Sequence, residues 1–298
     1  MYTKAAPYNI NISLASRLKA YFELIKFRLT SLVAISSAFG YLLGNSGEIS
    51  WSRFLLFTLG GFLITASGVT INQVLEKDLD KLMKRTMHRP LPTQRISVTE
   101  ALLFTMFTFA AGLFLLAQYA NILTAALATL SIVIYSLVYT PLKRAGSIAV
   151  YIGAFPGALP PLLGWVAATG GINTSALVIF LIQFLWQFPH FWSIAWVADE
   201  DYKLAGFRLL PVNGTTGRGS AIWILILTSL LLPAGILPYL FKISGFISAM
   251  IITLCGLIFL YKTIRHASDR SRESALGIMF FSFLYLPLVL LALLINKV

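Results

Sequence analysis

Residues 72–92 read NQVLEKDLDKLMKRTMHRPLP and concentrate charge in a chain in which only 11% of the residues are charged. On a helix, Asn72, Glu76 and Asp80 recur at i, i+4 and i+8, so their side chains share one face over about two turns. Two carboxylates at this spacing repel each other unless a cation lies between them. We therefore predict that this face binds a divalent metal ion.

The ligand chemistry of this face favours magnesium. Oxygen ligands without Cys or His suit Mg²⁺, an ion that keeps water ligands and usually bridges to phosphate oxygens. Arg85 and Arg89 follow four residues apart and would bind such phosphates in a bidentate manner. In the alternative interpretation, the segment is a plain basic loop whose acids only pair with Lys77, Lys81 and Lys84.

The composition around this segment indicates an integral membrane protein. The 298 residues are 58% hydrophobic, and the mean hydropathy is +0.81. We predict an all-α, polytopic single domain over residues 1–298, with about nine transmembrane helices in a ring-like bundle around a central cavity. Each candidate span suits about 30 Å of hydrocarbon, and they cover approximately residues 26–45, 52–72, 98–118, 121–140, 148–168, 175–197, 219–240, 245–262 and 275–295.

The distribution of Lys and Arg predicts the orientation of the bundle. With the N-terminus inside, 20 of the 23 basic residues, beginning with Lys4, fall on the inner side, and only Arg53, Lys242 and Lys297 fall outside. The positive-inside rule therefore places the N-terminus in the cytoplasm. The net charge of +12 then follows from topology and from attraction to anionic lipids, and we expect no nucleic-acid partner.

Acid clusters occur in two segments of the predicted inner side, residues 72–97 and residues 198–218, and we expect both to form cytoplasmic active-site loops. In the second, Asp199, Glu200 and Asp201 are consecutive, so a helix would spread them at about 100° per residue. In a ring-like bundle the two segments would face each other over the central cavity. Acids at the mouth and apolar walls below suit an amphiphile with a diphosphate head and a hydrocarbon tail.

Further candidates lie at or within the predicted spans. Lys26 and Arg28 begin the first span and Lys143 ends the fourth, where they could reach a diphosphate or act as snorkelling anchors. His190 is a polar residue inside an aromatic-rich span, and an intramembrane ionisable group is a functional candidate by default. The structural alternative is a neutral imidazole that hydrogen-bonds to Gln187 or to a neighbouring helix.

These segments resemble the UbiA-type superfamily of intramembrane prenyltransferases and, within it, the haem O synthases. The superfamily's first motif, an Asn with acids four and eight residues later, matches Asn72, Glu76 and Asp80. The RT and RPL elements in residues 85–91 and the WQ.PH pattern in residues 186–190 are similar to the haem branch.

The resemblance implies an activity and a location. A farnesyl group would pass from farnesyl diphosphate to a vinyl group of haem B, forming haem O for terminal oxidases and releasing diphosphate, in the bacterial inner membrane. The implied partners are farnesyl diphosphate, haem B and membrane lipids, together with a haem A synthase or an oxidase assembly factor.

The resemblance also implies roles for the candidate residues. Mg²⁺ would bind Asn72, Glu76 and Asp80, which form the catalytic set with Arg85 and Arg89. Phosphates or haem propionates would be bound by Lys26, Arg28, Arg85, Arg89 and Lys143. Glu200 and Asp201 would bind a second Mg²⁺ or orient basic residues. Haem contacts would come from His190, as an iron ligand or porphyrin anchor, and carbocation shielding from Trp186 and Trp192.

Two other functions remain compatible with the sequence. A prenyltransferase for a quinone or chlorophyll-type acceptor shares the metal motif and differs in the WQ.PH segment. A secondary transporter usually places its binding groups near the membrane midplane on broken helices. Because the acids here cluster at one end of the spans, transport is the weaker alternative.

Overall fold

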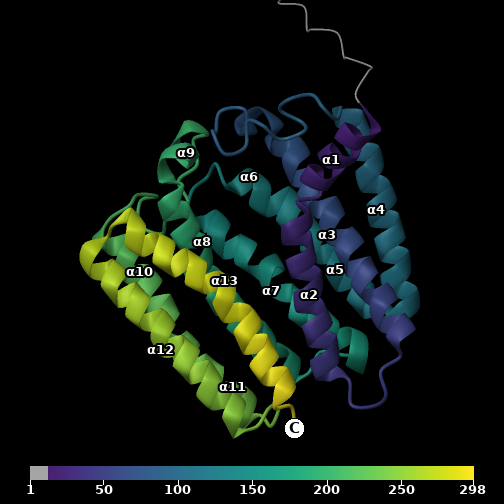
Figure 1. Cartoon of the computed structure of the whole chain (residues 1–298), viewed down its shortest axis with the longest axis vertical. Helices are drawn as coiled ribbons and strands as arrows, with labels where there is room; N and C mark the ends of the chain where they lie inside the picture. Colours follow the sequence, from purple (N-terminus) through teal and green to yellow (C-terminus); the bar gives the residue numbers. More distant parts are fainter. Residues whose placement is uncertain (1–12) are drawn as a thin grey trace, which may run out of the picture.

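A computed structural model describes residues 13–298, which are almost entirely helical (Figure 1). Lys4, counted above among the inner cations, lies outside the described residues. The helices are α1 (Leu14–Leu24), α2 (Phe27–Gly44), α3 (Trp51–Asp80), α4 (Val98–Tyr119), α5 (Ile122–Val133), the π-helix η1 (Ile134–Tyr139), α6 (Thr140–Leu142), α7 (Ile148–Thr169), α8 (Thr174–Val197), α9 (Asp199–Leu204), α10 (Arg218–Ser229), α11 (Leu231–Leu240), α12 (Phe246–Asp269) and α13 (Arg272–Ile295).

The predicted all-α class is confirmed, and residues 13–298 contain nine helical segments long and apolar enough to span a membrane. Two of the spans are formed by consecutive elements, α5–η1–α6 and α10–α11. The largest difference from the predicted bounds is at α3, which continues past residue 72 to Asp80. Its last turns, QVLEKDLD, are rich in the good helix formers Leu, Glu and Lys. The motif therefore belongs to the second span rather than to a loop.

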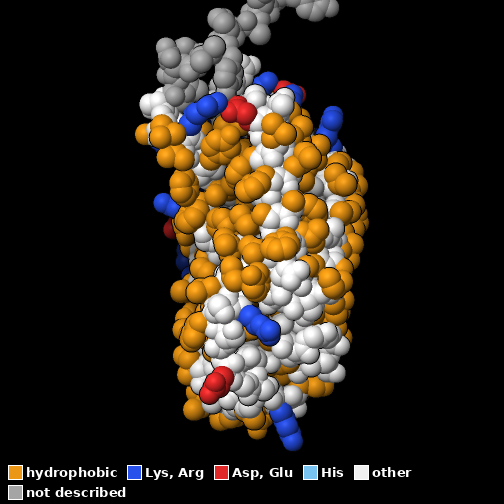
Figure 2. Space-filling model, turned by 90° about the vertical axis from the view of Figure 1, so that its right-hand side faces the viewer, with side chains coloured by type: hydrophobic (Ala, Val, Ile, Leu, Met, Phe, Trp, Pro, Cys, Tyr) orange, Lys and Arg blue, Asp and Glu red, His pale blue; other side chains and the backbone are white. Residues whose placement is uncertain are grey.

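The spans alternate in direction and give the bundle two distinct ends. We call the end that carries connections 81–97, 143–147 and 198–217 the polar end; the C-terminus lies at the opposite end (Figure 1). Arg53, Lys242 and Lys297 all lie at that opposite end, as the charge count predicted. Figure 2 shows the α4 side of the molecule, where apolar side chains dominate the middle of the surface and most charged ones lie toward the two ends.

Small residues bring α2 and α7 into close contact in the interior. Gly40 and Gly44 on α2 are four residues apart, the spacing at which small residues let two membrane helices approach. A methyl group on Gly40 would collide with the carbonyl oxygen of Pro161, and one on Gly44 would lie 3.1 Å from that of Trp165. On α7, a methyl group on Gly164 would collide with a backbone carbonyl of α2. The two backbones are therefore in contact here.

We expect Gly164→Ala to lower the yield and melting temperature of the folded protein. The added methyl group meets the backbone of Ser37, which cannot rotate away, and overpacking of this kind costs about 1–3 kcal/mol or more. Gly277→Ala on α13 is the matched control, because no atom lies within contact distance of its added methyl group. Thermal unfolding of both variants in detergent measures the difference. Equal melting temperatures for the two variants would contradict the close α2–α7 contact.

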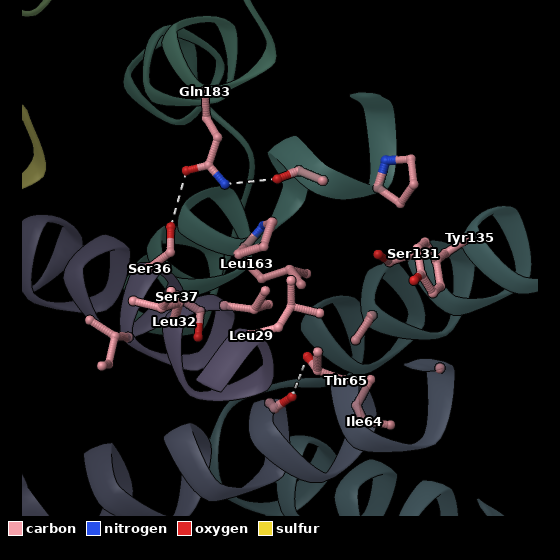
Figure 3. A pocket seen from close by; sticks show the side chains of 18 of the residues that line it. Leu29, Leu32, Ser36, Ser37, Ile64, Thr65, Ser131, Tyr135, Leu163 and Gln183 are labelled. Carbon is pink, nitrogen blue, oxygen red and sulfur yellow. Dashed lines mark hydrogen bonds between the residues drawn. The ribbon is translucent and has the colours of Figure 1, made fainter. Parts of the chain in front are cut away.

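A backbone carbonyl on α7 that lacks its helical donor links this helix to α8 and α2. Pro161 has no N–H, so the carbonyl oxygen of Gly157 lacks its helical donor. The side chains of Gln183 and Gln187 on α8 donate to that oxygen from their Nε2 atoms at 2.8 and 2.7 Å. Gln183 also accepts a 3.0 Å hydrogen bond from Ser36 on α2 (Figure 3). These bonds hold three spans together.

A cavity of about 330 Å³ lies beside this network and is lined mainly by apolar side chains of α2, α3, α5, η1, α7, α8 and α13 (Figure 3). Val69 on α3 and Leu29 on α2 form part of its wall. They lie three residues, about one helical turn, from Asn72 and Lys26. The cavity therefore begins directly below the polar cluster described next.

Candidate functional site

The polar face predicted on α3 is present and points into the bundle. Asn72, Glu76 and Asp80 are only 1%, 5% and 0% exposed. Asp78, on the other side of the same helix, is exposed and pairs with Lys77 and Lys81 at 2.6 and 2.8 Å. The plain basic-loop interpretation therefore describes Asp78 and does not describe Glu76 or Asp80.

Asp80 is paired with Arg89, which returns to α3 from connection 81–97. The Nη1 atom of Arg89 donates to both carboxylate oxygens of Asp80, at 2.9 and 2.8 Å. Thr86, which is fully buried, donates to the backbone carbonyl of Asp80 at 2.9 Å and so fixes the turn after α3. Removing one partner of a buried ion pair costs about 3–5 kcal/mol. The pair therefore holds this connection against the end of α3.

Glu76 is paired with Lys143 at the end of the fourth span. The distance from Lys143 Nζ to Glu76 Oε1 is 2.8 Å, and both side chains are nearly buried. The same ammonium group lies 4.8 Å from the ring centroid of Tyr139. Pro141 removes a helical donor just before Lys143, and the chain forms the π-helix η1 there. Such single π-turns occur frequently at functional sites.

Asn72 connects the cluster to the start of α2. Its amide donates to Thr140 at 3.1 Å, and its carbonyl oxygen accepts from Lys26 Nζ at 3.4 Å. Lys26 has a positive φ of 47°, which for a non-glycine residue is unusual and typical of functional sites. Its burial, together with the nearby cations Arg89 and Lys143, lowers its pKa to about 7.

The charges of the cluster do not balance. Three basic side chains, those of Lys26, Arg89 and Lys143, surround the two carboxylates of Glu76 and Asp80. Burial is the main cause of the lowered pKa of Lys26, and the neighbouring Arg89 and Lys143 lower it further. A buried site of this kind gains by binding an anion.

The donor set fits a magnesium ion that shares its coordination sphere with a substrate. No group of three or more His, Cys, Asp or Glu side chains converges anywhere in residues 13–298. A metal ion on the α3 face would have the amide oxygen of Asn72 and the carboxylates of Glu76 and Asp80 as its protein ligands. Its other positions would be filled by water or phosphate oxygens, the usual arrangement for Mg²⁺.

The two predicted acidic segments meet at the polar end. The carboxylate of Asp201, on α9, accepts hydrogen bonds from the backbone N–H groups of Lys84 at 2.8 Å and Arg85 at 3.1 Å. The guanidinium of Arg85 lies 5.6 Å from the ring centroid of Tyr202. Of the two roles considered for Asp201, this geometry matches the orientation of a basic segment.

The structure does not bring all of the predicted residues into the cluster. Arg28 and Glu200 are exposed, and neither side chain forms a hydrogen bond or ion pair with another residue of the described part of the chain. Arg85 and Arg89 do not share a helical face, because residues 81–97 form turns rather than a helix. Arg89 precedes Pro90, and a residue before proline is disfavoured in a helix.

His190 lies on the cavity wall, and its ring is held from two sides. Its Nδ1 atom is 2.8 Å from the hydroxyl of Ser282 on α13, so the neighbouring-helix partner considered from the sequence is Ser282 and not Gln187. Trp186 stacks on the imidazole with ring centroids 4.4 Å apart. Trp192, by contrast, is fully buried and lies outside the cavity lining.

Sequence reasoning missed several of the residues that complete these arrangements. Tyr139 and Thr140 could have been found from the YTPLKR segment, because a proline close to a conspicuous basic pair signals irregular helix. Gln183 and Ser282 carried no local signal, since each is a single polar residue in an apolar span. Their roles depend on partners from other helices.

Comparison with known proteins gives consistent matches over nearly the whole chain. The UbiA prenyltransferase family model matches residues 33–284. A protein from Cytophaga hutchinsonii named protoheme IX farnesyltransferase is 50% identical over 285 residues, which cover 96% of this chain and 100% of that protein.

Solved structures share the fold. One, from work on digeranylgeranylglyceryl phosphate synthase, has a TM-score of 0.78 at 26% identity and covers 94% of this chain and 98% of its own. A UbiA homologue from Archaeoglobus fulgidus, solved bound to GPP and Mg²⁺, has a TM-score of 0.68 at 18% identity and covers 92% of this chain and 99% of its own.

Proposed function

The chain belongs to the UbiA prenyltransferase family, and we propose that it transfers the farnesyl group of farnesyl diphosphate to a vinyl group of haem B, forming haem O and releasing diphosphate. The similarity to a protoheme IX farnesyltransferase over nearly the full length of both chains supports the acceptor. The observation that carries the proposal is the buried cluster with excess positive charge at the mouth of an apolar cavity. This arrangement suits a diphosphate head and an isoprenoid tail.

The side chains of the cluster divide into metal ligands and diphosphate ligands. Asn72, Glu76 and Asp80 would hold Mg²⁺, the ion present with a prenyl diphosphate in the Archaeoglobus homologue. When bound, this ion neutralises the charge that develops on the departing diphosphate. Lys143 and Arg89 form ion pairs with the two carboxylates, and they would bind diphosphate oxygens when a metal ion binds the acids.

The cavity then determines the fate of the allylic group. The C–O bond of farnesyl diphosphate breaks with its electron pair leaving on diphosphate, and the allylic carbon bonds to the terminal vinyl carbon of the porphyrin. The cation left next to the porphyrin ring takes hydroxide from water, which releases a proton. Aromatic rings on the cavity wall, including Tyr135, Tyr139 and Trp186, stabilise the allylic cation by cation–π contact and exclude water from it.

We extend the proposal to the setting of the protein. The protein would span the bacterial inner membrane with its polar end on the cytoplasmic side, because the basic residues gather at that end. Membrane lipids would cover the apolar middle of the surface, which Figure 2 shows on the α4 side. Haem O formed here would pass to a haem A synthase or to an oxidase assembly factor.

The proposal is tested by the porphyrin that the purified protein forms. Incubation with Mg²⁺, haem B and farnesyl diphosphate, followed by mass spectrometry, is expected to yield a haem that has gained one farnesyl group and one hydroxyl group. A parallel incubation with an aromatic acid such as 4-hydroxybenzoate is expected to yield no prenylated product. Prenylation of the aromatic acid with unchanged haem would reject haem as the acceptor.

We expect Asp201→Asn to lower farnesyl transfer about ten-fold, mainly through a higher KM for farnesyl diphosphate. An amide oxygen can replace only one of the two acceptor atoms that hold Lys84 and Arg85. Ten-fold corresponds to about 1.4 kcal/mol, close to the lower end for a hydrogen bond to a charged group.

Glu200→Gln is the matched control for Asp201→Asn, because it makes the same chemical change at the adjacent, exposed side chain. Steady-state kinetics of both variants against farnesyl diphosphate decides the matter. Equal KM values for the two variants would show that the contact between the segments does not support the site.

A further inference from the structure

His190 presents its ring to the apolar cavity from within a span. It lies seven residues before the end of α8 at Val197, about 10 Å along the helix axis from the polar end. The cluster on α3 contains the groups that a diphosphate needs, and the cavity wall suits a hydrocarbon. Neither substrate feature uses an imidazole, so His190 calls for a separate explanation.

The hydrogen bonds of Ser282 determine which nitrogen of His190 carries the proton. The hydroxyl of Ser282 donates to the carbonyl oxygen of Met279 at 2.6 Å. A serine hydroxyl has only one proton to donate. When that proton is directed at Met279, the Ser282 oxygen can only accept a hydrogen bond from Nδ1 of His190, which is 2.8 Å away. This geometry favours the tautomer in which Nδ1 carries the hydrogen, and in that neutral ring Nε2 carries an unshared lone pair.

The lone pair on Nε2 is free to bind a ligand. Nε2 forms no hydrogen bond with any residue in the described part of the chain, and the ring lines the cavity. His266 on α12 provides a contrast within the same protein. Its Nδ1 also contacts a serine, Ser274, at 2.7 Å, but its Nε2 is fully buried and the residue is absent from the cavity lining.

The orientation of the His190 ring is fixed by the same segment of α13. Trp186 covers one face of the imidazole at an interplanar angle of 15°. The indole N–H of Trp186 donates to the backbone carbonyl of Ser282 at 2.9 Å. Phe283 packs edge-on with ring centroids 5.0 Å apart. One turn of α13 therefore holds both rings.

A neutral imidazole that donates one N–H to an oxygen and offers its other nitrogen is the usual arrangement of a metal-binding histidine. Of the two proposed substrates, only haem contains a metal ion that such a nitrogen can coordinate, its iron. We propose that Ser282 is a positioning residue that holds His190 in the Nδ1–H tautomer, so that Nε2 binds the iron of the acceptor haem. This inference rests on the proposed function, which supplies haem as the substrate.

The test compares two porphyrins that differ only in the metal. The purified full-length protein is titrated with ferric haem B and with metal-free protoporphyrin IX. His190→Ala is expected to weaken haem binding about 100-fold and to shift the Soret band, with protoporphyrin affinity unchanged. Ser282→Ala is expected to weaken haem binding about ten-fold, the lower end of the effect of residues that orient metal ligands. Added imidazole is expected to restore the Soret band of His190→Gly.

Each contrary result overturns a defined part of the inference. Equal loss of haem and protoporphyrin binding in His190→Ala would mean that the ring only packs against the porphyrin. An unchanged haem spectrum combined with lost turnover would instead make His190 a proton acceptor. A parental spectrum and affinity in Ser282→Ala would remove the positioning role. The proposed function fails separately if the parent protein binds haem with an intact iron–imidazole spectrum and forms no farnesylated porphyrin.

Discussion

Asp80→Ala is expected to lower farnesyl transfer by at least about 10³-fold, the upper end of the loss seen when one electrostatic contact to a transition state is removed. The substitution removes a carboxylate proposed to hold Mg²⁺ and leaves Arg89 without its partner at the end of α3. Product formation by mass spectrometry, in detergent-solubilised protein checked for folding, measures the effect. Asp80→Asn keeps the volume of the side chain and is expected to show a loss of the same order.

The same helix supplies the control for this substitution. Asp78 is only two residues away, is exposed, and pairs only with Lys77 and Lys81. Asp78→Ala is therefore expected to retain parental turnover. If Asp80→Asn also retained it, Asp80 would be excluded as a metal ligand, and Arg89 would be assigned to holding connection 81–97 rather than to the chemistry.

Lys26→Met is expected to lower kcat/KM for farnesyl diphosphate about 100-fold and to leave the melting temperature equal or higher. Burial and two neighbouring cations lower the pKa of Lys26 from 10.5 to about 7. A base with a lowered folded-state pKa binds protons less well folded than unfolded, so its charge destabilises the fold at neutral pH. Methionine keeps the length of the side chain and removes the charge that the diphosphate would use.

Arg28→Met is the matched control, because it also removes one positive charge. Arg28 lies two residues from Lys26, and its exposed side chain forms no ion pair with any described residue. Kinetics and thermal unfolding of both variants separate affinity from stability. A loss of affinity shared equally by the two would mean that general surface charge, rather than the buried cluster, attracts farnesyl diphosphate. It would also move Arg28 back among the candidates.

Much of the fold follows from hydropathy, because each apolar run long enough to cross the bilayer became a span. The inward face of α3 could also be predicted, since helical periodicity alone places Asn72, Glu76 and Asp80 together. The partners of these residues could not be predicted in this way. Arg89 pairs with Asp80 only because connection 81–97 turns back on α3, and Lys143 reaches Glu76 only through the packing of two spans.

The conformation of the connection that carries Arg85 and Arg89 could not be predicted from their spacing. Their spacing of four suggests neighbours only if the chain is helical, and the prolines that follow make a helix unfavourable there. The tautomer of His190 lay beyond sequence reasoning for a different reason. It depends on the hydrogen bonds of one serine on α13, a helix far from His190 in the sequence.

The carbonyl of Gly157 makes the residues tolerated on one helix depend on those present on another. Pro161 leaves that oxygen without a backbone donor, and Gln183 and Gln187 supply two side-chain donors in its place. A residue with an N–H group at position 161 would restore the helical bond and relax the requirement for amides. Among related sequences these three positions should therefore covary, and replacing either glutamine should be harmful only in proteins that keep the proline.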